Sequence, residues 1–579
     1  PTSGDSLQFD TVGLAGLNLT YDVPAATING ITFNADSDAF IIAGSGANNM
    51  SLAGDIANNS VNDQELGMVI GGTVVNSGTG AGAINLTGGI DSTVTSITEN
   101  SSTSALNIST NPITVNAGGT TLTDTSGSLA VSGGVTGAGD LTLQNNTATD
   151  DALSITTNSV NNTGIITNNG TGTGETLISG GVGSNVTGIT ENSATSTLLI
   201  NTNDLTLNAG GTTLIDTLGT LEVDSDVSGA GDLTLKNNTA VDDALLLVGN
   251  VNNTGTITNS GTGTGEALIF GTLGSNVTGI TENSATSNLF IEDLVVNAGG
   301  TTLTDTSGLF SLNFGVSGAG DLILNNNTAV GNALSIVGNS VNNSGTITNS
   351  GTGAGATEIS GGVDSNVTGI TENSATSALT IDSNPITVNA GGTTLTDTSG
   401  ILTVSGGISG TGDLILQNNT ATDDALSITT NSVNNIGTIT NNGAGTGEAL
   451  ISGGVGSNIT GITENSATSA LTIDTNPLTV NAGGTTLTDT TGQLTVSGGV
   501  DGTGNLLLVN NSSIGAGINL DTDNINNTGT MTNTGTGSDN TSISALIDSN
   551  VTDVIQNTGT SMLILSNNSN AYTGATTIT

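Results

Sequence analysis

Three pairs of adjacent aspartates are the side chains of this sequence best suited to acid–base chemistry. Two neighbouring carboxyl groups can act as general acid and base in the cleavage of polysaccharides. An active site is one asymmetric constellation, however, whereas these pairs occupy equivalent places in separate repeats, and a lyase would also need Arg or Lys beside its substrate. We therefore predict no enzymatic activity and interpret the pairs as structural corners. The pairs are Asp150 and Asp151, Asp242 and Asp243, and Asp423 and Asp424.

Two further aspartate motifs have the composition of calcium-binding turns. In calcium-binding solenoid repeats an aspartate returns at every coil. Here each motif returns only once per long repeat, which corresponds to about 19 Å along a stack of coils. This spacing favours diffuse screening by counter-ions over a defined metal site, and no cofactor is predicted. The motifs are GAGDL or GTGDL (Asp140, Asp232, Asp321, Asp413) and GGTTLTD or GGTTLID (Asp124, Asp216, Asp305, Asp397, Asp489).

The charge of the chain is almost entirely negative. Asp and Glu contribute 48 of the 579 residues and Lys236 is the single basic side chain, so that the formal net charge is −47. Such a chain cannot neutralise phosphates with a basic patch, which excludes nucleic acid as a partner. Attraction to an anionic membrane also requires clustered Lys or Arg, and no run of about 18 apolar residues is present to insert into a bilayer. Without cysteine, neither disulfides nor a thiolate metal site can hold the fold.

Five near-copies of one long segment organise the sequence. The motif NAGGTT begins at Asn116, Asn208, Asn297, Asn389 and Asn481, at intervals of 92, 89, 92 and 92 residues. The glutamate of the motif ITEN follows a similar spacing, and Gln556 takes its place in the last copy. Because repeats override length as a guide to domain number, the repeat decides the fold.

Each long repeat divides into steps of about 23 residues. An apolar residue followed by polar turn residues marks the steps at Leu143, Ile166, Ile189 and Leu214, and Leu235 begins the next repeat. Within each step apolar residues alternate with Thr or Ser over three to five positions, which is the pattern of a half-buried strand. Gly and Asn separate these runs and permit tight corners.

A unit of about 23 residues cannot bury its apolar face alone, whereas stacked parallel coils bury a continuous narrow core. The sequence therefore predicts an all-β fold, a parallel β-solenoid (β-helix) of about 25 coils of about 23 residues, grouped in 92-residue long repeats. At about 4.8 Å per coil the stack would be a rod about 120 Å long. The four marker residues Leu143, Ile166, Ile189 and Leu214 are expected inside it on successive coils. Disorder is the competing interpretation of this composition, and the evenly spaced Leu, Ile and Val residues disfavour it.

A polar residue follows the marker residue of each coil at a short distance. If the coils are in register, these side chains stack into a ladder in which amides and carboxylates hydrogen-bond to one another. The alternative is a row of solvated corners. The predicted ladder consists of Asn145, Asn168, Glu191, Asp216 and Asn237.

Four of the seven phenylalanines fall within 45 residues of the third long repeat. Alignment of the copies places Phe310 in the core, while Phe290 replaces Asn107 at an outward position. An outward phenylalanine on so polar a chain is typical of a binding surface. The alternative is that the shortened third repeat forms a wider coil that takes the rings inside. The candidate contact surface consists of Phe270, Phe290 and Phe314.

Both ends of the sequence resemble known secreted proteins. The opening PTSGDSLQFD, with TINGITFNADSDAFIIAGSG and SLAGDIANNS, resembles passenger segments of bacterial autotransporter-like proteins, and NNSNAYTGATTIT is similar to the autotransporter-associated β-strand repeat. The resemblance covers about the first 60 and the last 14 residues well and the AGGTTLTDTSG units between them loosely. It implies a parallel β-helix that is secreted or displayed on the bacterial surface, and it implies no particular activity. The start at Pro1 and the stop within a repeat at Thr579 are expected of a processed form or a fragment.

These observations define three expected parts and one expected role. Residues 1–73 form an N-terminal passenger-like β segment continuous with the solenoid, residues 74–554 the repetitive solenoid, and residues 555–579 a repeat end truncated within a coil. The predicted function is that of a secreted, extracellular or cell-surface structural protein, a rigid rod acting as a surface or fibre subunit. Its expected partners are further copies joined end to end into filaments. The alternative function is an adhesin that binds glycans or other cells.

Overall fold

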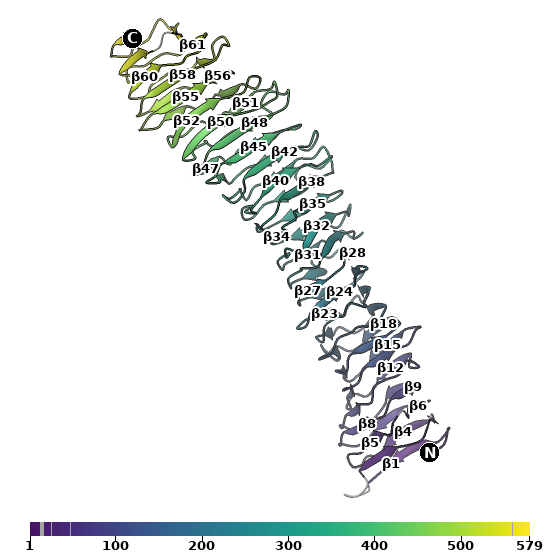
Figure 1. Ribbon diagram of the computed structural model, residues 1–579. Helices are drawn as coiled ribbons and strands as arrows, with labels where there is room; N and C mark the ends of the chain where they lie inside the picture. The colour runs from purple at the N-terminus through teal and green to yellow at the C-terminus, as the bar shows by residue number, and fades with distance from the viewer. Residues whose placement is uncertain (12–16, 25, 47, 558–559) are drawn as a thin grey trace. The chain divides into compact units, whose positions relative to one another are not determined.

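The computed structural model describes residues 1–11, 17–24, 26–46, 48–557 and 560–579. Over this part the chain forms 64 short strands and no helix, and therefore no helix long and apolar enough to cross a membrane. The chain divides into two compact units: unit 1 comprises Pro1–Val277 with Thr281–Phe290, and unit 2 comprises Thr278–Ile280 with Ile291–Thr579. Within each unit, strands of successive coils stack side by side and pair in parallel (Figure 1). The predicted all-β parallel solenoid of about 25 coils is thus confirmed.

Each coil passes through up to three short strands, which form faces A, B and C of the solenoid. The second long repeat shows the order. Face A contains β18 (Leu141–Asn145), β20 (Ile165–Asn168), β22 (Gly188–Glu191), β25 (Thr212–Asp216) and β28 (Leu233–Asn237). Face B contains β19 (Leu153–Ile155), β21 (Thr176–Ile178), β23 (Leu198–Ile200), β26 (Leu221–Val223) and β29 (Leu245–Leu247). Face C contains β24 (Leu205–Leu207) and β27 (Val227–Gly229). In other coils face C is formed by single β-bridges, such as the one between Val160 and Val182.

The core is a narrow column of aliphatic side chains contributed by all three faces. Alternation along each strand turns every second residue inward, so that the three-residue strands of face B bury their first and third residues. The expected core residues Leu143, Ile166, Ile189 and Leu214 are all fully buried, which confirms the predicted inward face. Val160 and Val182 close the core from face C.

The register differs by two residues at one coil of each long repeat. Ile166 pairs with Ile189, and Ile189 with Leu214, as expected. Leu141 rather than Leu143 pairs with Ile166, however, which places Asn168 beside Leu143. The five-residue strand β18 buries two leucines before its polar residue, whereas β20 buries one isoleucine, so the last apolar residue does not mark the same height in both coils.

The NAGG corners show why these residues recur. In the second repeat, Asn208 accepts a hydrogen bond from the Gly210 amide through its own Oδ1 at 2.8 Å, and its Nδ2 donates to the carbonyl of Ser184 in the preceding coil at 2.7 Å. Gly211 has φ +98°, a left-handed conformation that glycine adopts without strain. A Cβ on Gly231, one coil later, would lie 1.9 Å from the backbone oxygen of Asn208, so only glycine fits there.

The first coils belong to the same type of stack. On face A, β1 (Ser6–Phe9) pairs with β4 (Gly30–Phe33), and β4 pairs with β7 (Ile56–Asn58). Phe9 stacks on Phe33 with ring centroids 4.9 Å apart, and Phe40 lies 5.0 Å from Phe9. The three phenylalanines outside the third repeat therefore pack together in the first coils, with Phe33 and Phe40 buried and Phe9 half-exposed. This cluster was not predicted from the sequence.

Candidate functional site

The predicted polar ladder lies at the ends of the face A strands, where the chain leaves the sheet. All five of its side chains are buried. The Nδ2 of Asn168 donates a hydrogen bond to Oε2 of Glu191 in the next coil at 2.7 Å. The other carboxyl oxygen of Glu191 accepts the amide of Ser193 at 2.5 Å. Glu191 is therefore held on both oxygens although no cation is near it in the described part of unit 1.

Asp216 occupies the next position in register above Glu191. Its Oδ1 accepts hydrogen bonds from the amides of Leu218 at 3.2 Å and Gly219 at 3.0 Å. Its Oδ2 is buried, and no hydrogen-bond donor reaches it among the described residues. One carboxyl oxygen of Asp216 thus stabilises the turn of the chain, and the other has no hydrogen-bond partner among the described residues. The same is found for Asp124, Asp305 and Asp397 in their repeats.

Asn237 and Asn145, the two outer members of the predicted ladder, donate hydrogen bonds to backbone carbonyls rather than to other ladder side chains. Asn237, in register with Asp216, donates to the carbonyl of Glu266 at 2.7 Å and accepts the amide of Thr239 at 2.9 Å. Asn145 makes the equivalent bonds to Glu175 and Thr147. Because of the two-residue shift, Asn145 and Asn168 are not at the same height. Asn168, Glu191, Asp216 and Asn237 therefore stand in register, but among these described side chains only Asn168 and Glu191 are hydrogen-bonded to each other, and Asn145 stands apart from the row.

Burial dominates the ionisation of these carboxyl groups. It raises the pKa of Glu191 to about 8, and the neighbouring Asp216 raises it further, while the hydrogen bonds from Asn168 and Ser193 act in the opposite direction. Burial also raises the pKa of Asp216 to about 6, against the two amide hydrogen bonds to it. Glu372 and Glu464 reach pKa values of about 8 for the same reason. At neutral pH these glutamates are mostly protonated.

The Asn–Glu bond recurs once in each long repeat. Its distances lie between 2.7 and 2.8 Å. In the last copy Asn533 donates instead to Oε1 of Gln556 at 2.9 Å, so a neutral amide fills the same place as the glutamate. The pairs are Asn76 and Glu99, Asn168 and Glu191, Asn259 and Glu282, Asn349 and Glu372, and Asn441 and Glu464.

The aspartate pairs sit at the corner that leads into face B. The second member adopts a left-handed conformation at Asp151 (φ 59°), Asp243 (φ 57°) and Asp424 (φ 60°). Asn332 (φ 58°) and Ala516 (φ 55°) take the same conformation at the equivalent positions of the other repeats. The corner therefore requires this backbone conformation in every repeat, whereas the carboxyl groups are present in only three.

A glutamate from the next coil completes an acidic cluster at two of these corners in unit 1. The Glu175 amide donates to Oδ1 of Asp150 at 3.0 Å. Burial raises the pKa of Glu175 to about 7, with the negative charges of Asp151 and Asp150 as further causes. Burial, Asp243 and Asp242 raise the pKa of Glu266 in the same way. Among the described residues, no group of three or more His, Cys, Asp or Glu side chains is placed to hold a metal ion.

The three candidate contact phenylalanines lie outside the core. Phe290 is the half-exposed middle residue of β33 (Leu289–Ile291), between two buried neighbours. Phe270 directly follows β31 (Ala267–Ile269) and is 53% exposed. Phe314 is 45% exposed. Phe270 and Phe290 belong to unit 1 and Phe314 to unit 2, while Phe310 is fully buried, as its alignment predicts.

Sequence reasoning missed a longer apolar feature on the outer surface of face B. The middle residues of its three-residue strands face outward and stand in register from coil to coil; we call this row the outer file. In the earlier coils of unit 1 the file carries Asn85, Asn107, Ala130 and Ser154. From β21 to β31 it contains four half-exposed leucines interrupted by one glutamate. In chain order the residues are Leu177, Leu199, Glu222, Leu246 and Leu268. The signal was present in the strand sequences TLI, LLI, LLL and ALI, which are apolar at the position that alternation assigns to solvent.

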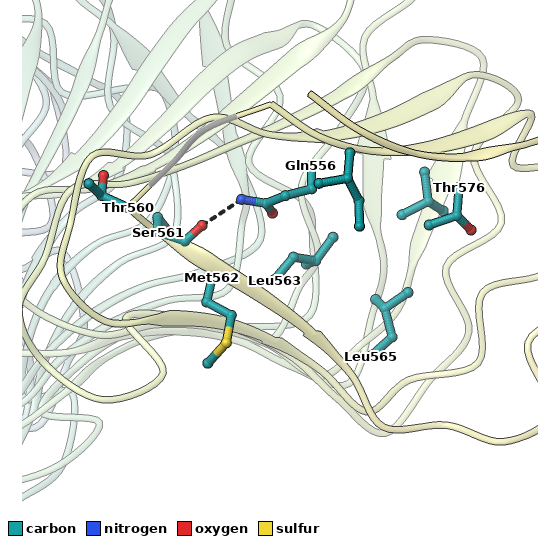
Figure 2. Close-up of a pocket in the computed structure, with 9 residues that line it drawn as sticks. Gln556, Thr560, Ser561, Met562, Leu563, Leu565 and Thr576 are labelled. Carbon is teal, nitrogen blue, oxygen red and sulfur yellow. Dashed lines mark hydrogen bonds between the residues drawn. The ribbon is translucent and has the colours of Figure 1, made fainter.

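A cavity of about 350 Å³ lies among β62 (Asp553–Gln556), β63 (Met562–Leu565) and β64 (Thr576–Ile578). Figure 2 shows the Gln556 side chain pointing toward Ser561, whose carbonyl accepts a hydrogen bond from Nε2 at 2.7 Å. Leu563 and Leu565 line the same space. None of the nine residues that line this cavity is ionisable, so they offer apolar and amide contacts rather than acid–base chemistry.

Fold and surfaces together define the class of this protein as a parallel β-solenoid repeat protein with buried carboxyl groups and one apolar outer file. Comparison of the chain with models of protein families, with curated proteins and with solved structures gave no match.

Proposed function

We propose that this chain is a non-enzymatic, extracellular structural protein that serves as a rigid subunit of a cell-surface layer or fibre. The observation that carries the proposal is the continuity of the parallel ladders, since in each unit the strands of one coil pair in register with those of the next. A stack of this kind resists bending because every coil is fixed to its neighbours through the backbone. The resemblance of both ends to autotransporter-like passengers supports a secreted or surface location.

The corners support the non-enzymatic part of the proposal. The acidic pairs alternate with Gly331–Asn332 and Gly515–Ala516 at equivalent places, which is the behaviour of a turn whose backbone matters more than its side chain. Assembly into a fibre would continue the ladders from one copy to the next, because an unpaired parallel strand offers N–H and C=O groups to a further strand.

Electron microscopy of the purified protein at physiological ionic strength tests this function. We expect filaments that lengthen with protein concentration. Single particles at every concentration, together with a monomeric mass by light scattering, would exclude the fibre subunit.

An adhesin is the second candidate, and the exposed Phe270 favours it. The equivalent positions of other repeats carry Ser179, Ser360 and Ser452, so the fold does not require an aromatic side chain there. Aromatic rings supply large contact areas in binding surfaces. We expect Phe270→Ser to reduce saturable binding to glycans or cells if the protein is an adhesin, and to leave filament formation unchanged if it is a fibre subunit.

A further inference from the structure

The leucines of the outer file are not demanded by the fold. At equivalent positions other repeats carry polar residues such as Asn107, Thr380 and Thr472, and their strands pair in the same register. In the first repeat Asn107 even donates a hydrogen bond to Asn85 along the file, at 2.9 Å. Outward leucines on four of five consecutive coils therefore expose apolar surface that folding alone would replace with polar groups.

Two further apolar residues enlarge the apolar surface beside Leu246 and Leu268, at the C-terminal end of this stretch. Val248 and Phe270 follow directly after β29 and β31, and their exposed fractions are 37% and 53%. The strands carrying them are in register at Leu246 and Leu268, so these four side chains form one apolar patch.

Acidic side chains lie beside the file on both sides: four exposed aspartates and two half-exposed glutamates on the entry side, and two exposed aspartates after one strand on the exit side. Asp150, Asp151, Asp242 and Asp243 lie at the corners where the chain enters face B, joined by Glu175 and Glu266. Asp224 and Asp226 lie where the chain leaves it after β26. Burial first, and then the nearby charges of Asp151 and Asp150, raise the pKa of Glu175 to about 7.

We propose that the outer file and its two acidic borders form a docking surface for a cationic amphipathic helix of another protein. A second copy of this chain cannot be the occupant, because its net charge is −47 and Lys236, its one basic residue, lies on face A. An anionic lipid surface is repelled by the same borders. A helix with an apolar stripe between rows of Lys or Arg matches both the file and its borders.

The dimensions agree with this occupant. From Leu177 to Leu268 the file rises over four coil steps, or about 19 Å at the ordinary strand spacing, and a helix of about 13 residues has that length. The helical pitch of about 5.4 Å is close to the coil spacing of about 4.8 Å, so successive turns would meet successive coils. A three-residue strand spans about 10 Å, similar to the diameter of a helix, which brings flanking Lys and Arg to the borders. Because Glu222 lies within the file, we expect the apolar stripe of the helix to carry one Lys or Arg near its middle.

Binding of designed peptides to the full chain tests the proposal. The probe is a fluorescent 14-residue helical peptide with Leu on one face and Lys on the other, measured by fluorescence anisotropy at physiological salt. A peptide with the same lysines but Ser in place of Leu reports attraction to the negative chain alone. We expect the Leu/Lys peptide to bind at least 10-fold more tightly than the Ser/Lys peptide. Equal affinities would overturn the proposal.

Substitutions locate the binding. The double variant Leu246→Thr/Leu268→Thr introduces a residue that unit 2 carries at the same file, and we expect it to weaken the Leu/Lys peptide about 10-fold. Leu450→Thr is the matched control, since Leu450 is an isolated leucine of the file in unit 2 with the same kind of acidic corner, Asp423, Asp424 and Glu448, beside it. An equal loss in both variants, or none in the double variant, would contradict the assigned surface.

Hydrogen exchange on the unaltered protein gives a readout that does not depend on the variants folding. Addition of the Leu/Lys peptide should slow exchange in and around β21, β23, β26, β29 and β31. Protection confined to other coils would place the peptide elsewhere, and a peptide-independent dimer covering these strands would assign the face to self-association; either result overturns the proposal.

Discussion

The polar ladder of face A, a buried column of side chains, and the outer file of face B are formed by the same coils. The column keeps its residue types from one long repeat to the next, whereas the file changes them. At the column, Glu191 and Asp216 repeat Glu99 and Asp124 of the previous long repeat. At the outer file, Leu199 replaces Asn107. The column is buried and each of its groups must be hydrogen-bonded or neutral, whereas the file is half exposed and tolerates either polarity.

A similar contrast is found between the leucine-rich stretch of the outer file in unit 1 and a stretch of the file in unit 2. Over five consecutive coils of unit 2 the file reads Thr380, Thr403, Ser427, Leu450 and Thr472, with a single leucine. The buried columns of both units keep the Asn–Glu bond. The residues of the outer file vary while those of the buried column stay constant. We therefore expect differences in binding between the units to come from the outer file, and the stability of the fold to come from the buried residues.

Adjacent leucines of β23 give the sharpest test of this contrast and the largest expected effect. Leu198 is fully buried and Leu199 points outward on the same strand. We expect Leu198→Ala to lower the free energy of unfolding by about 3 kcal/mol, since it leaves a cavity in the core. Leu199→Ala is the control, with an expected loss below about 1 kcal/mol. Urea denaturation and hydrogen exchange around β23 measure both, and similar losses would show that the file is packed as a second core.

The buried glutamates predict an unusual dependence of stability on pH. Their pKa is raised in the folded state, so folding favours the protonated form. The stabilisation is complete below the ordinary glutamate pKa of about 4.5 and is lost as the pH rises to about 8. The protein should therefore be more stable at pH 5 than at pH 8.

Glu191→Gln tests the origin of this dependence. Gln556 already fills the equivalent place and accepts the same asparagine hydrogen bond, so the substitution suits the fold. We expect it to raise the unfolding free energy at pH 8 by on the order of 2 kcal/mol and to leave it unchanged at pH 4.5. Asp150→Asn makes the same acid-to-amide change at an exposed carboxyl group and is the control. A melting temperature of the Glu191→Gln variant that follows the unaltered protein at every pH would contradict a buried, protonated Glu191.

Much of the fold could be predicted from the sequence because alternation and repeat spacing report directly on which side chains face inward. The inward leucines, the parallel stacking and the amide-to-carboxylate bond between Asn168 and Glu191 all follow from that pattern. The two-residue shift at Leu141 could not be predicted in this way, since a marker based on the last apolar residue cannot distinguish one buried leucine from two. The outer file could not be predicted in this way either, because its leucines look like ordinary core residues until the register of the strands is known.

The corner at Asp151 tests whether exposure alone predicts tolerance, and its expected effect is the smallest. Asp151 is exposed, like the file, but its backbone is left-handed, with φ 59°. Asp151→Asn copies Asn332 at the equivalent corner of another repeat, which adopts φ 58°, and we expect a change in unfolding free energy below about 0.5 kcal/mol. Asp151→Val places a β-branched residue in this conformation and should cost about 1–2 kcal/mol. Thermal unfolding of the two variants at pH 7 separates the two causes. Equal losses of stability would mean that the carboxylate stabilises the corner, whereas a loss with Val alone assigns the constraint to the backbone conformation. In the second case an exposed position tolerates substitution only where its φ is negative.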